Sequence, residues 1–437
     1  MTKIIVPDAA HESPWPHRRT AAWALALLFF AYVLAFLDRI VLSILVRPIS
    51  AELQLSDMQF ALVGGVAFAL FYVTMGLPIG WLADRFSRRR IVAVGVALWS
   101  LCTIASGLAS DFAGLFAARL GVGIGEAALA PAAYSLIADL YPPERRGRAV
   151  ALYTLGATIG SSIAYFAGGL LIEFASAHGA ILGLPPWRFV FFAAGAPGIL
   201  LAALMLTMRE PARRQSARVA KPASFVAFLK ARREVSIAYI LGYSCINLPF
   251  AGFLLWGPAL FDRVHGLRPA QLALPLALLF LVPTALGQWL GATVTDRMLA
   301  KGRADAAFRT AAVCAALLVP VAVAMPLLGD SAAALAALGL LLFLTCASVG
   351  HHAVVAATVA PNRLRGLYVA LFFFVQNVMG QAIIAVITAG LTDHVFERPD
   401  SIGLSMAIVG GAGAAAGTLL LILGREALRR AAAEPHP

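Results

Sequence analysis

Long apolar runs recur along the whole chain and constrain its fold more than any other feature. A run of about 20 apolar residues spans the hydrocarbon core of a bilayer as a helix. Only 13% of the 437 residues are charged, against about 25% in soluble domains. We therefore expect an all-α membrane protein with twelve transmembrane helices, at about residues 21–46, 58–81, 90–109, 112–140, 149–174, 188–208, 235–261, 271–296, 306–328, 332–360, 366–391 and 402–424.

Basic residues are distributed unevenly between the loops, and the formal net charge is +12. Most of the Lys and Arg side chains lie in the N-terminal tail, in alternate loops, in the segment 209–234 and in the C-terminal tail. Because basic loops stay on the cytoplasmic side of a membrane, we expect both termini in the cytoplasm. Topology accounts for the charge, so we expect no nucleic-acid partner. The Arg- and Ala-rich composition favours a GC-rich bacterial genome, and hence the bacterial cytoplasmic (inner) membrane.

Two short sequences recur at nearly the same offset. GWLADRFSRRR, from Gly80, is matched by GATVTDRMLAKGR, from Gly291; PPERRGRAVAL, from Pro142, is matched by APNRLRGLYVAL, from Ala360. Duplicated halves with a site between them are common among membrane transport proteins. We expect two pseudo-symmetric six-helix bundles, residues 1–208 and 235–437, the second with a short cytoplasmic tail. A charged cytoplasmic linker at 209–234 joins them.

Along its whole length the chain resembles a transporter of the major facilitator superfamily (MFS). The segment GWLADR, from Gly80, followed by three arginines from Arg88, is similar to the superfamily's signature loop between helices 2 and 3. Arg119 followed by GVGIG is similar to its helix 4 motif. The resemblance implies the MFS fold and transport by alternating access.

Within the superfamily the chain most resembles the spinster-like branch. The residues that carry this resemblance are Asp38-Arg39, Arg119 with Glu126, and the stretch GEAALAPAAYSLIADLYPPERRGRA. The resemblance implies proton-coupled transport of lysophospholipid or sphingolipid-like amphiphiles.

Ionised residues inside the expected helices are candidates for the mechanism. At about 1.5 Å per residue, Asp38 lies about 12 Å below the outer end of helix 1, and Arg119 lies about 10 Å below that of helix 4. A bridge between them is therefore expected. Glu126 lies on the same face as Arg119 and nearer the midplane. Intramembrane charges are costly and usually functional. We expect Asp38, Arg119 and Glu126 to couple protons to the conformation, with Arg119 exchanging partners between the acids; a static ion pair is the alternative.

The second half carries uncharged polar and aromatic residues in its expected helices. On each of the expected helices 7 and 11 these residues share one face. One wall of the expected cavity between the bundles is then aromatic and apolar, while the other is charged. Such a cavity suits an amphiphile or a lipophilic drug. Arg39 either contributes to the mechanism or pairs locally. The candidate substrate-binding residues are Arg39, Tyr153, Tyr243, Asn247, Phe250, Phe373, Asn377 and Gln381.

The signature loop is a candidate gate. In the superfamily this loop latches helix 2 to helix 11 on the cytoplasmic side. Asp84 can accept from exposed amides at the start of helix 11, near Gly366, and Arg88 can meet Asp139 at the end of helix 4. Retention of basic residues inside the cell is the alternative explanation. The candidate gating residues are Asp84, Arg85, Arg88, Asp139 and Gly366.

These features favour a proton-coupled secondary transporter of lysolipid-like amphiphiles, with an MFS drug or small organic-anion transporter as the alternative. The sequence contains no convincing serine elbow, zinc spacing or acidic metal motif, so we expect no enzyme and no cofactor beyond the coupling proton. A sensor or scaffold would typically add a soluble domain. We expect a monomer whose partners are membrane lipids and the amphiphilic substrate.

Overall fold

The computed structural model describes residues 15–179, 183–213 and 222–434, apart from a few side chains, among them that of Asp84. Twelve helical segments of this part are long and apolar enough to cross a membrane, as the apolar runs predict. The last helix differs most from its expected range. It continues past residue 424 to Ala433, where Arg425 and Arg429 are held by Asp305.

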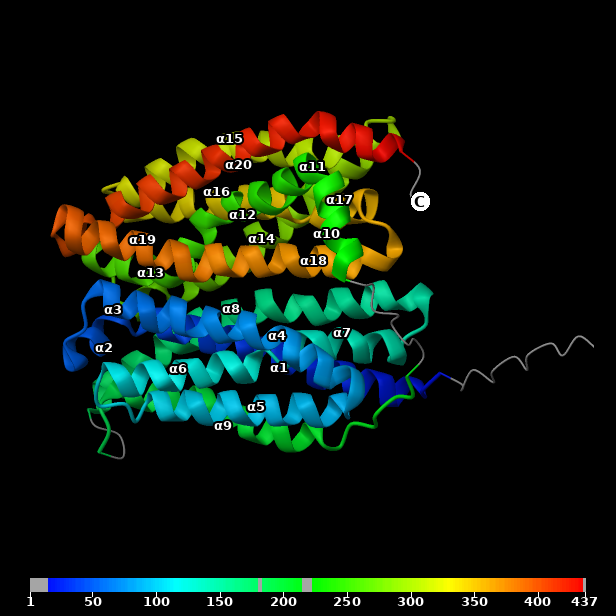
Figure 1. Ribbon diagram of the computed structural model, residues 1–437. Coiled ribbons are helices and arrows are strands. Elements are labelled where there is room, and N and C mark those ends of the chain that lie inside the picture. The colour runs from blue at the N-terminus through cyan, green and yellow to red at the C-terminus, as the bar shows by residue number, and fades with distance from the viewer. Residues whose placement is uncertain (1–14, 180–182, 214–221, 435–437) are drawn as a thin grey trace, which may run out of the picture.

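The first six spans form the lower half of the molecule in Figure 1. We call this bundle the N-half. Its elements are α1 (Arg18–Ile44), α2 (Val46–Leu53), α3 (Asp57–Ala61), the π-helical η1 (Leu62–Val66), α4 (Ala67–Arg85), α5 (Arg88–Ser106), α6 (Phe112–Glu126), α7 (Leu129–Leu140), α8 (Pro143–His178) and α9 (Pro186–Met205). Side-chain caps fix several starts: Ser87 accepts from the N–H of Arg90 before α5, and Asp111 accepts from the N–H of Gly114 before α6.

The last six spans form the upper half, which we call the C-half. A short helix of the linker, α10 (Pro222–Ala231), precedes it. Its elements are α11 (Arg233–Ile237), η2 (Ala238–Gly242), α12 (Tyr243–Ile246), α13 (Leu248–His265), α14 (Pro269–Ala300), α15 (Ala306–Ala324), η3 (Met325–Leu327), α16 (Ser331–Val349), α17 (His352–Val359), α18 (Asn362–Asn377), η4 (Val378–Ile383), α19 (Ile384–Gly390), η5 (Leu391–Phe396), η6 (Pro399–Ser401) and α20 (Ile402–Ala433).

Several spans are interrupted near their middles. The fourth span breaks after Glu126, where α6 gives way to α7. The tenth breaks correspondingly between Val349 and His352, and the seventh at Asn247, just before Pro249. Interrupted helices expose backbone groups that continuous helices satisfy internally, and transporters use them to line central sites.

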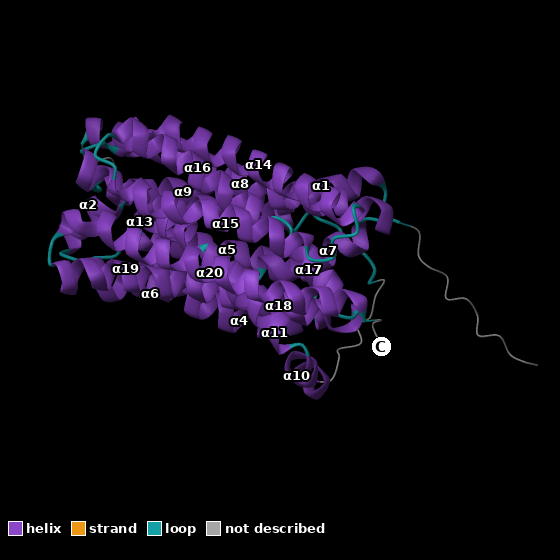
Figure 2. Ribbon diagram, turned by 90° about the horizontal axis from the view of Figure 1, so that it is seen from above, coloured by secondary structure: helices purple, strands orange, loops and turns teal. Residues whose placement is uncertain are grey.

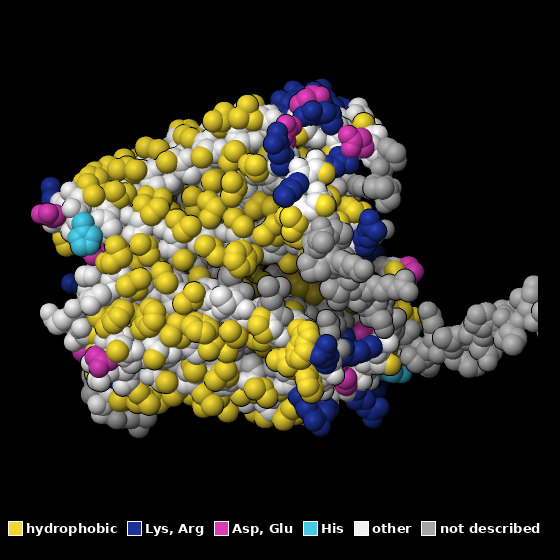
Figure 3. All heavy atoms as spheres, in the orientation of Figure 1, with side chains coloured by type: hydrophobic (Ala, Val, Ile, Leu, Met, Phe, Trp, Pro, Cys, Tyr) yellow, Lys and Arg dark blue, Asp and Glu magenta, His cyan; other side chains and the backbone are white. Residues whose placement is uncertain are grey.

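The two ends of the bundle differ in charge. The start of α1 and the end of α20 lie at the same end, on the right in Figure 1, and Lys and Arg side chains gather there in Figure 3. We call this the basic end. The opposite end, where α1 and α13 finish, is the far end. Hydrophobic side chains cover most of the visible face between the two ends (Figure 3), as a protein surface in contact with lipid requires.

The halves pack against each other mainly through α8 with α14 and through the second span (α3, η1 and α4) with the eleventh (η4 and α19), and to a smaller extent through α1 with α13. Small residues allow close approach: a Cβ at Gly169 of α8 would lie 2.7 Å from the carbonyl oxygen of Pro269, which starts α14. Nearby, the rings of Tyr165 and Phe280 have centroids 4.8 Å apart. These contacts lie in the part of the interface nearer the far end.

Candidate functional site

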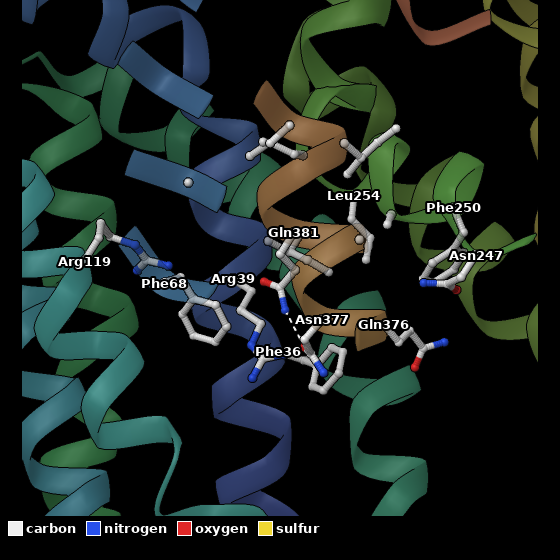
Figure 4. Close-up of a pocket in the computed structure, with 17 residues that line it drawn as sticks. Phe36, Arg39, Phe68, Arg119, Asn247, Phe250, Leu254, Gln376, Asn377 and Gln381 are labelled. Carbon is white, nitrogen blue, oxygen red and sulfur yellow. Dashed lines mark hydrogen bonds between the residues drawn. The ribbon is translucent and has the colours of Figure 1, made fainter. Parts of the chain in front are cut away.

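A cavity of about 260 Å³ lies between the two halves, near the middle of the bundle (Figure 4). Side chains of both halves line it. The N-half contributes Phe36, Arg39, Ile40, Phe68 and Arg119, and the C-half contributes Asn247, Phe250, Leu254, Leu255, Gln376, Asn377, Gln381 and Ile384. The wall from the N-half therefore carries the ionised groups, and the wall from the C-half carries amides beside apolar side chains.

The expected bridge between helices 1 and 4 is present. Arg119 of α6 donates through Nη1 to Oδ2 of Asp38 of α1 at 2.7 Å. Asp38 also accepts from the hydroxyl of Thr103 on α5. Both members of the pair are buried, with exposed fractions of 1% and 3%. Since each buried charge is costly alone, the pair lets two helices of the N-half, α1 and α6, carry ionised groups beside the cavity without an uncompensated charge.

Glu126 does not pair with Arg119. Its partner is Arg39, whose Nη2 and Nε donate to the same carboxylate oxygen, Oε2, at 2.6 and 2.8 Å. Arg119 and Glu126 lie about two turns apart on one face of α6, and each meets one of the neighbouring residues Asp38 and Arg39 of α1. In this conformation the two acids therefore form two separate ion pairs, and exchange of Arg119 between them stays a prediction. Arg39 thus pairs with a residue of another helix and also lines the cavity, which leaves both alternatives for Arg39 open.

Arg39 is also surrounded by aromatic rings. Its guanidinium carbon lies 4.5 Å from the ring centroid of Phe68, 5.0 Å from that of Phe36 and 5.1 Å from that of Tyr72. Cation–π contacts of this kind add to the ion pair and hold the cation over the cavity. Figure 4 shows Arg39 between Phe68 and Phe36, on the side of the cavity opposite Asn247.

Each ion pair leaves one buried polar atom without a hydrogen-bond partner. Oε1 of Glu126 and Nε of Arg119 are both buried and unpaired among the described residues. The other carboxylate oxygen of Glu126 already accepts both bonds from Arg39. The N-half wall therefore has zero net charge from two acids and two arginines, with one spare acceptor and one spare donor.

The C-half wall is built from amides on two helices. Gln381 donates to Oδ1 of Asn377 at 2.8 Å, drawn as a dashed line in Figure 4, and Asn377 donates to the carbonyl of Phe373 at 2.8 Å. Gln376 and Asn247 face the same cavity. Amide groups offer both donors and acceptors, so this wall can bind hydroxyl or headgroup oxygens without adding charge.

Three candidate binding residues do not line the cavity. Tyr153 is fully buried inside the N-half, where its ring stacks on Tyr32 with centroids 4.6 Å apart. Tyr243 is buried in the C-half, beside Phe308 and His351. The turn at Asn247 and the π-helical η2 rotate Tyr243 off the face that a regular helix would share with Phe250.

Phe373, the third, lies on α18 nearer the basic end. Its ring contacts those of His352 and Phe372, with centroids 5.3 and 5.2 Å away. The π-helical η4 begins directly after Asn377 and shifts the register of the helix between Phe373 and Gln381. A face drawn with regular helical spacing does not survive such a segment.

The far end is closed by ion pairs between the halves. Arg263 of α13 binds Asp57 of α3 through two bonds of 2.5 and 2.6 Å. Arg47 binds Asp262 at 2.8 Å. Asp393 of the C-half accepts from the N–H of Met58 at 2.7 Å, at the start of α3. These contacts, which the sequence analysis did not anticipate, join the halves where α1, α3 and α13 meet.

The halves separate toward the basic end. A Cβ added at Gly80 of α4, Gly147 of α8 or Gly366 of α18 would meet no atom within 4 Å. At the level of the cavity, by contrast, a Cβ at Gly65 would overlap the carbonyl oxygen of Gln381 from the other half. The cavity is therefore closed toward the far end, and space opens between the helices at the basic end.

The signature loop forms a cluster inside the N-half. Arg88 is buried, binds Asp139 as expected, and donates through Nε to Glu210 at 3.0 Å. Glu210 also accepts from the backbone N–H of Arg89 at 2.9 Å and from the hydroxyl of Ser87 at 2.8 Å. Burial works against ionisation of Glu210, but these hydrogen bonds outweigh it and lower its pKa.

The remaining gating candidates are less informative. The Asp84 side chain lies outside the described residues, so its latch to helix 11 stays a prediction. The guanidinium of Arg85 lies over the ring of Trp81, 3.8 Å from its centroid. Gly366 is exposed in the open region.

Glu210 and the far-end pairs are functional candidates that sequence reasoning missed. Glu210 follows the sixth expected helix within an arginine-rich segment, so an acid there was a usable signal. Asp57 and Arg263 have no such signal because they are 206 residues apart. Within residues 15–179, 183–213 and 222–434, no three His, Cys, Asp or Glu side chains come together as a metal site needs.

Comparison with known proteins agrees with this geometry. A crystal structure of a bacterial homolog of the human lysosomal transporter spinster, in an inward-facing and unoccupied conformation, matches with a TM-score of 0.77 and 26% identity, over 95% of this chain and 98% of that one. A probable L-galactonate transporter of Escherichia coli is 29% identical over 72% of this chain and 70% of its own length. An MFS-type efflux pump of Mycolicibacterium smegmatis is 33% identical over 46% of this chain, and the match spans only 44% of that pump.

The family-level match is broader. Residues 28–385 match the model of the Major Facilitator Superfamily, which is well over half of the chain. The twelve spans and the cavity between two six-span halves are those of this fold. The chain therefore belongs to the Major Facilitator Superfamily, and within it is similar to the spinster-like branch.

Proposed function

We propose that the protein is a proton-coupled secondary transporter that carries an anionic amphiphile of the lysophospholipid or sphingolipid-like class by alternating access. The observation that carries this proposal is the state of Arg39. Its guanidinium lines the cavity and is neutralised by one oxygen of Glu126, while the other oxygen of that carboxylate is buried and unpaired.

Glu126 is the group through which a proton would act. A proton on its free oxygen removes the negative charge that holds Arg39. Arginine keeps its own proton at any physiological pH, so the cavity then gains one uncompensated cation. An acidic headgroup is the partner that restores neutrality. A proton bound alone would leave Arg39 without a counterion, and an anion bound alone would add a second negative charge beside Glu126. Proton and substrate therefore bind together.

The second pair has a supporting role in this scheme. Asp38 remains bonded both to Arg119 and to the hydroxyl of Thr103. These bonds keep α1, α5 and α6 in register while Arg39 changes partner. The free Nε of Arg119 offers one further donor to the substrate.

The substrate class rests on the two walls of the cavity and on the similarity to the spinster homolog. Arg39 and the amides of Asn247, Asn377 and Gln381 can bind a phosphate and its polar headgroup. Phe250, Leu254 and the rings around Arg39 can contact an acyl chain, which would extend through the open space toward the basic end.

Alternating access follows from the asymmetry of the two ends. Breaking the far-end pairs and closing the basic end would turn the cavity toward the opposite side of the membrane. We propose that the halves, residues 1–208 and 235–437, move as two bodies joined by the linker at 209–234. The cytoplasm would lie at the basic end, and Asp84 would latch near Gly366 when that end closes. The protein would act as a monomer, with the proton as its only coupling ion.

A small organic anion is the second candidate, and the size of the cavity favours it. About 260 Å³ accommodates a headgroup or a sugar acid more readily than a whole lipid. The amides of the C-half suit the hydroxyl groups of such an acid. The similarity to a probable L-galactonate transporter supports this alternative. The proton step at Glu126 would be the same.

Transport by purified protein in proteoliposomes tests both candidates. Labelled lysophospholipid and labelled galactonate would be followed with and without an imposed pH gradient, for the wild type and Glu126→Gln. We expect gradient-driven accumulation in the wild type and its loss in Glu126→Gln. Glu397→Gln is the matched control, because Glu397 is an exposed acid in the far-end loop.

The outcomes separate the parts of the proposal. Accumulation of galactonate without lysophospholipid would move the assignment to the second candidate. Equal transport by wild type and Glu126→Gln, indifferent to the gradient, would remove the proton step. Absence of movement for both substrates would remove both substrate classes.

A further inference from the structure

A second, larger pocket lies at the basic end of the C-half, away from the transport cavity. Its volume is about 840 Å³. It is enclosed by the linker helix α10, the start of α11, the end of α17, the start of α18 and the end of α20. Four membrane spans begin or end here, at Arg233, Val359, Arg363 and Ala433. The pocket therefore lies at the level where the hydrocarbon core meets the headgroups.

Positive charge dominates the walls of this pocket. Five basic and two acidic side chains line it. The acids are each engaged: Glu234 binds Arg430 at 2.6 Å, and Glu434 binds Arg232 at 2.7 Å. Lys230, Arg233 and Arg363 also line the pocket and form no ion pair among the described residues. Three clustered cations without counterions repel one another, and an anion between them lowers that energy.

The floor of the pocket is apolar. Phe228 of α10 lies across the ring of Tyr368 on α18, with centroids 5.4 Å apart. Val235 and Leu364 line the same space. A soluble phosphate compound gains nothing from these groups, whereas the glycerol and upper acyl carbons of a lipid would bury against them.

The position of α10 leaves the pocket accessible from the membrane. Figure 2 shows α10 at the periphery of the bundle, beside α11, rather than between the two halves. Phe225 and Phe228 pack on the C-half, while Val226 of the same helix is 52% exposed. An amphipathic helix with basic residues at its end is typical of a segment that lies in the interface plane of a membrane.

We propose that this pocket binds the headgroup of an anionic phospholipid from the leaflet at the basic end. Arg233 and Arg363 would bind the phosphate in bidentate fashion, and Lys230 would bind a second negative oxygen. Basic pockets between membrane helices at a cytoplasmic surface suit anionic headgroups of this kind. Zwitterionic lipids lack the net charge that three unpaired cations require. The bound lipid would tie α10, and with it the end of the linker, to α18 and α20.

Thermal unfolding and native mass spectrometry of the full-length protein in detergent test the proposal. The probes are phosphatidylglycerol, cardiolipin and phosphatidylcholine, with glycerol 3-phosphate and inorganic phosphate as soluble anions. We expect the two anionic lipids to raise the unfolding temperature and to remain bound in the spectrometer. The triple variant Lys230→Gln/Arg233→Gln/Arg363→Gln should bind them about 100-fold more weakly, since each cation near a membrane surface contributes about fivefold.

A matched triple variant separates this pocket from general surface charge. Arg297→Gln/Lys301→Gln/Arg303→Gln removes the same charge from the exposed end of α14 and the loop that follows it, at the same end of the protein, and it should retain the affinity of the wild type. Equal weakening in both triple variants would overturn the proposal, as would equal binding of phosphatidylcholine. Stabilisation by glycerol 3-phosphate as strong as that by lipid would reassign the pocket to a soluble phosphate. The single variant Arg363→Gln, expected to bind about fivefold more weakly, replaces the triple variant if that protein does not fold.

Discussion

The two halves share a helix plan but contribute different chemistry to the cavity between them. The N-half brings two acids and two arginines, paired as Asp38 with Arg119 and Arg39 with Glu126. The C-half brings amides and apolar side chains to the facing wall. Duplication supplies the scaffold twice, and the charged residues that line the cavity belong to one copy. We infer that the N-half couples the proton and the C-half selects the substrate.

At the basic end the halves are alike, with the signs of charge reversed. In the N-half, Arg88 at the start of α5 binds Glu210, which follows α9. In the C-half, Asp305 before α15 binds Arg425 and Arg429 near the end of α20. Each pair ties the third span of its half to the sixth. Charges at the ends therefore brace each half, and the buried charges in the middle distinguish the halves.

The variant with the largest expected effect is the one that breaks the buried ion pair between Asp38 and Arg119 in the N-half. Asp38→Asn leaves the guanidinium of Arg119 buried without a counterion. Loss of one partner from a buried pair costs about 3–5 kcal/mol. We expect a clear drop in the unfolding temperature of the purified protein and little or no transport in proteoliposomes.

Thr103→Val is the control for this variant. It removes the hydrogen bond from the hydroxyl to the carboxylate of Asp38 and leaves both charges in place, so its effect should be smaller, about 1.5–3 kcal/mol as for a bond to a charged group. If Asp38→Asn unfolded at the wild-type temperature and transported normally, the pair would be dispensable, and the contrast between the halves would lose its physical basis.

Depth and helical periodicity were enough to predict part of the site. The apolar runs give all twelve spans because their length matches the bilayer. The pairs Asp38–Arg119 and Arg88–Asp139 follow from residues at matching depths or at adjoining helix ends. The sequence also indicates the division of function between the halves. The candidate binding residues of the second half are all uncharged, whereas the first half has charged residues inside its expected helices.

Irregular backbone and long sequence separation explain the rest. Tyr243 turns away from the cavity because a π-helical segment and the break at Asn247 displace it. Such irregular segments do not change the pattern of hydrophobic residues, so the sequence does not reveal them. Glu210 lies 123 residues from Ser87, and a contact of that separation is set by packing of the whole half.

The second prediction concerns the link between the halves at the far end. Asp57→Asn weakens the two bonds from Arg263. The side chain of Asp57 is 8% exposed and that of Arg263 is 19% exposed. A charge-assisted bond of this kind contributes about 1.5–3 kcal/mol, so the equilibrium should shift about tenfold or more toward the state open at the far end. Spin labels at that end on α3 and α13 should report longer distances.

Asp262→Asn is the comparison, because its partner Arg47 is 77% exposed at the side chain. Exposed pairs contribute about 0–1 kcal/mol, so the distance distribution should change little. Equal opening in both variants would mean that general charge at the far end, rather than the Asp57–Arg263 pair, holds it closed.

The third prediction tests the selecting role of the C-half. Gln381→Ala removes a donor to Asn377 and one amide from the cavity wall. Loss of one neutral hydrogen bond to substrate costs about 0.5–1.5 kcal/mol, a rise in KM of about 2- to 12-fold. Dependence on the pH gradient should remain as in the wild type. A loss of coupling in Gln381→Ala would place part of the proton step in the C-half and weaken the comparison.

The smallest expected effects come from the mirrored pairs at the basic end. Burial works against ionisation of Glu210 and Asp305, but hydrogen bonds outweigh it and lower the pKa of both. An acid whose pKa is lower in the folded protein stabilises the fold at pH values above its pKa in the unfolded chain, which is about 4 for these acids. This stabilisation is lost as the pH falls through the pKa of the folded protein. Glu210→Gln and Asp305→Asn should therefore each lower the free energy of unfolding at pH 7 by about 1 kcal/mol or less, because solvent screens their partners, and the unfolding temperature should fall with it. The gap to the wild type should close below about pH 4. A gap in one variant that persists at low pH would mean that packing, and not charge, braces that half, so the two halves would not be equivalent at the basic end.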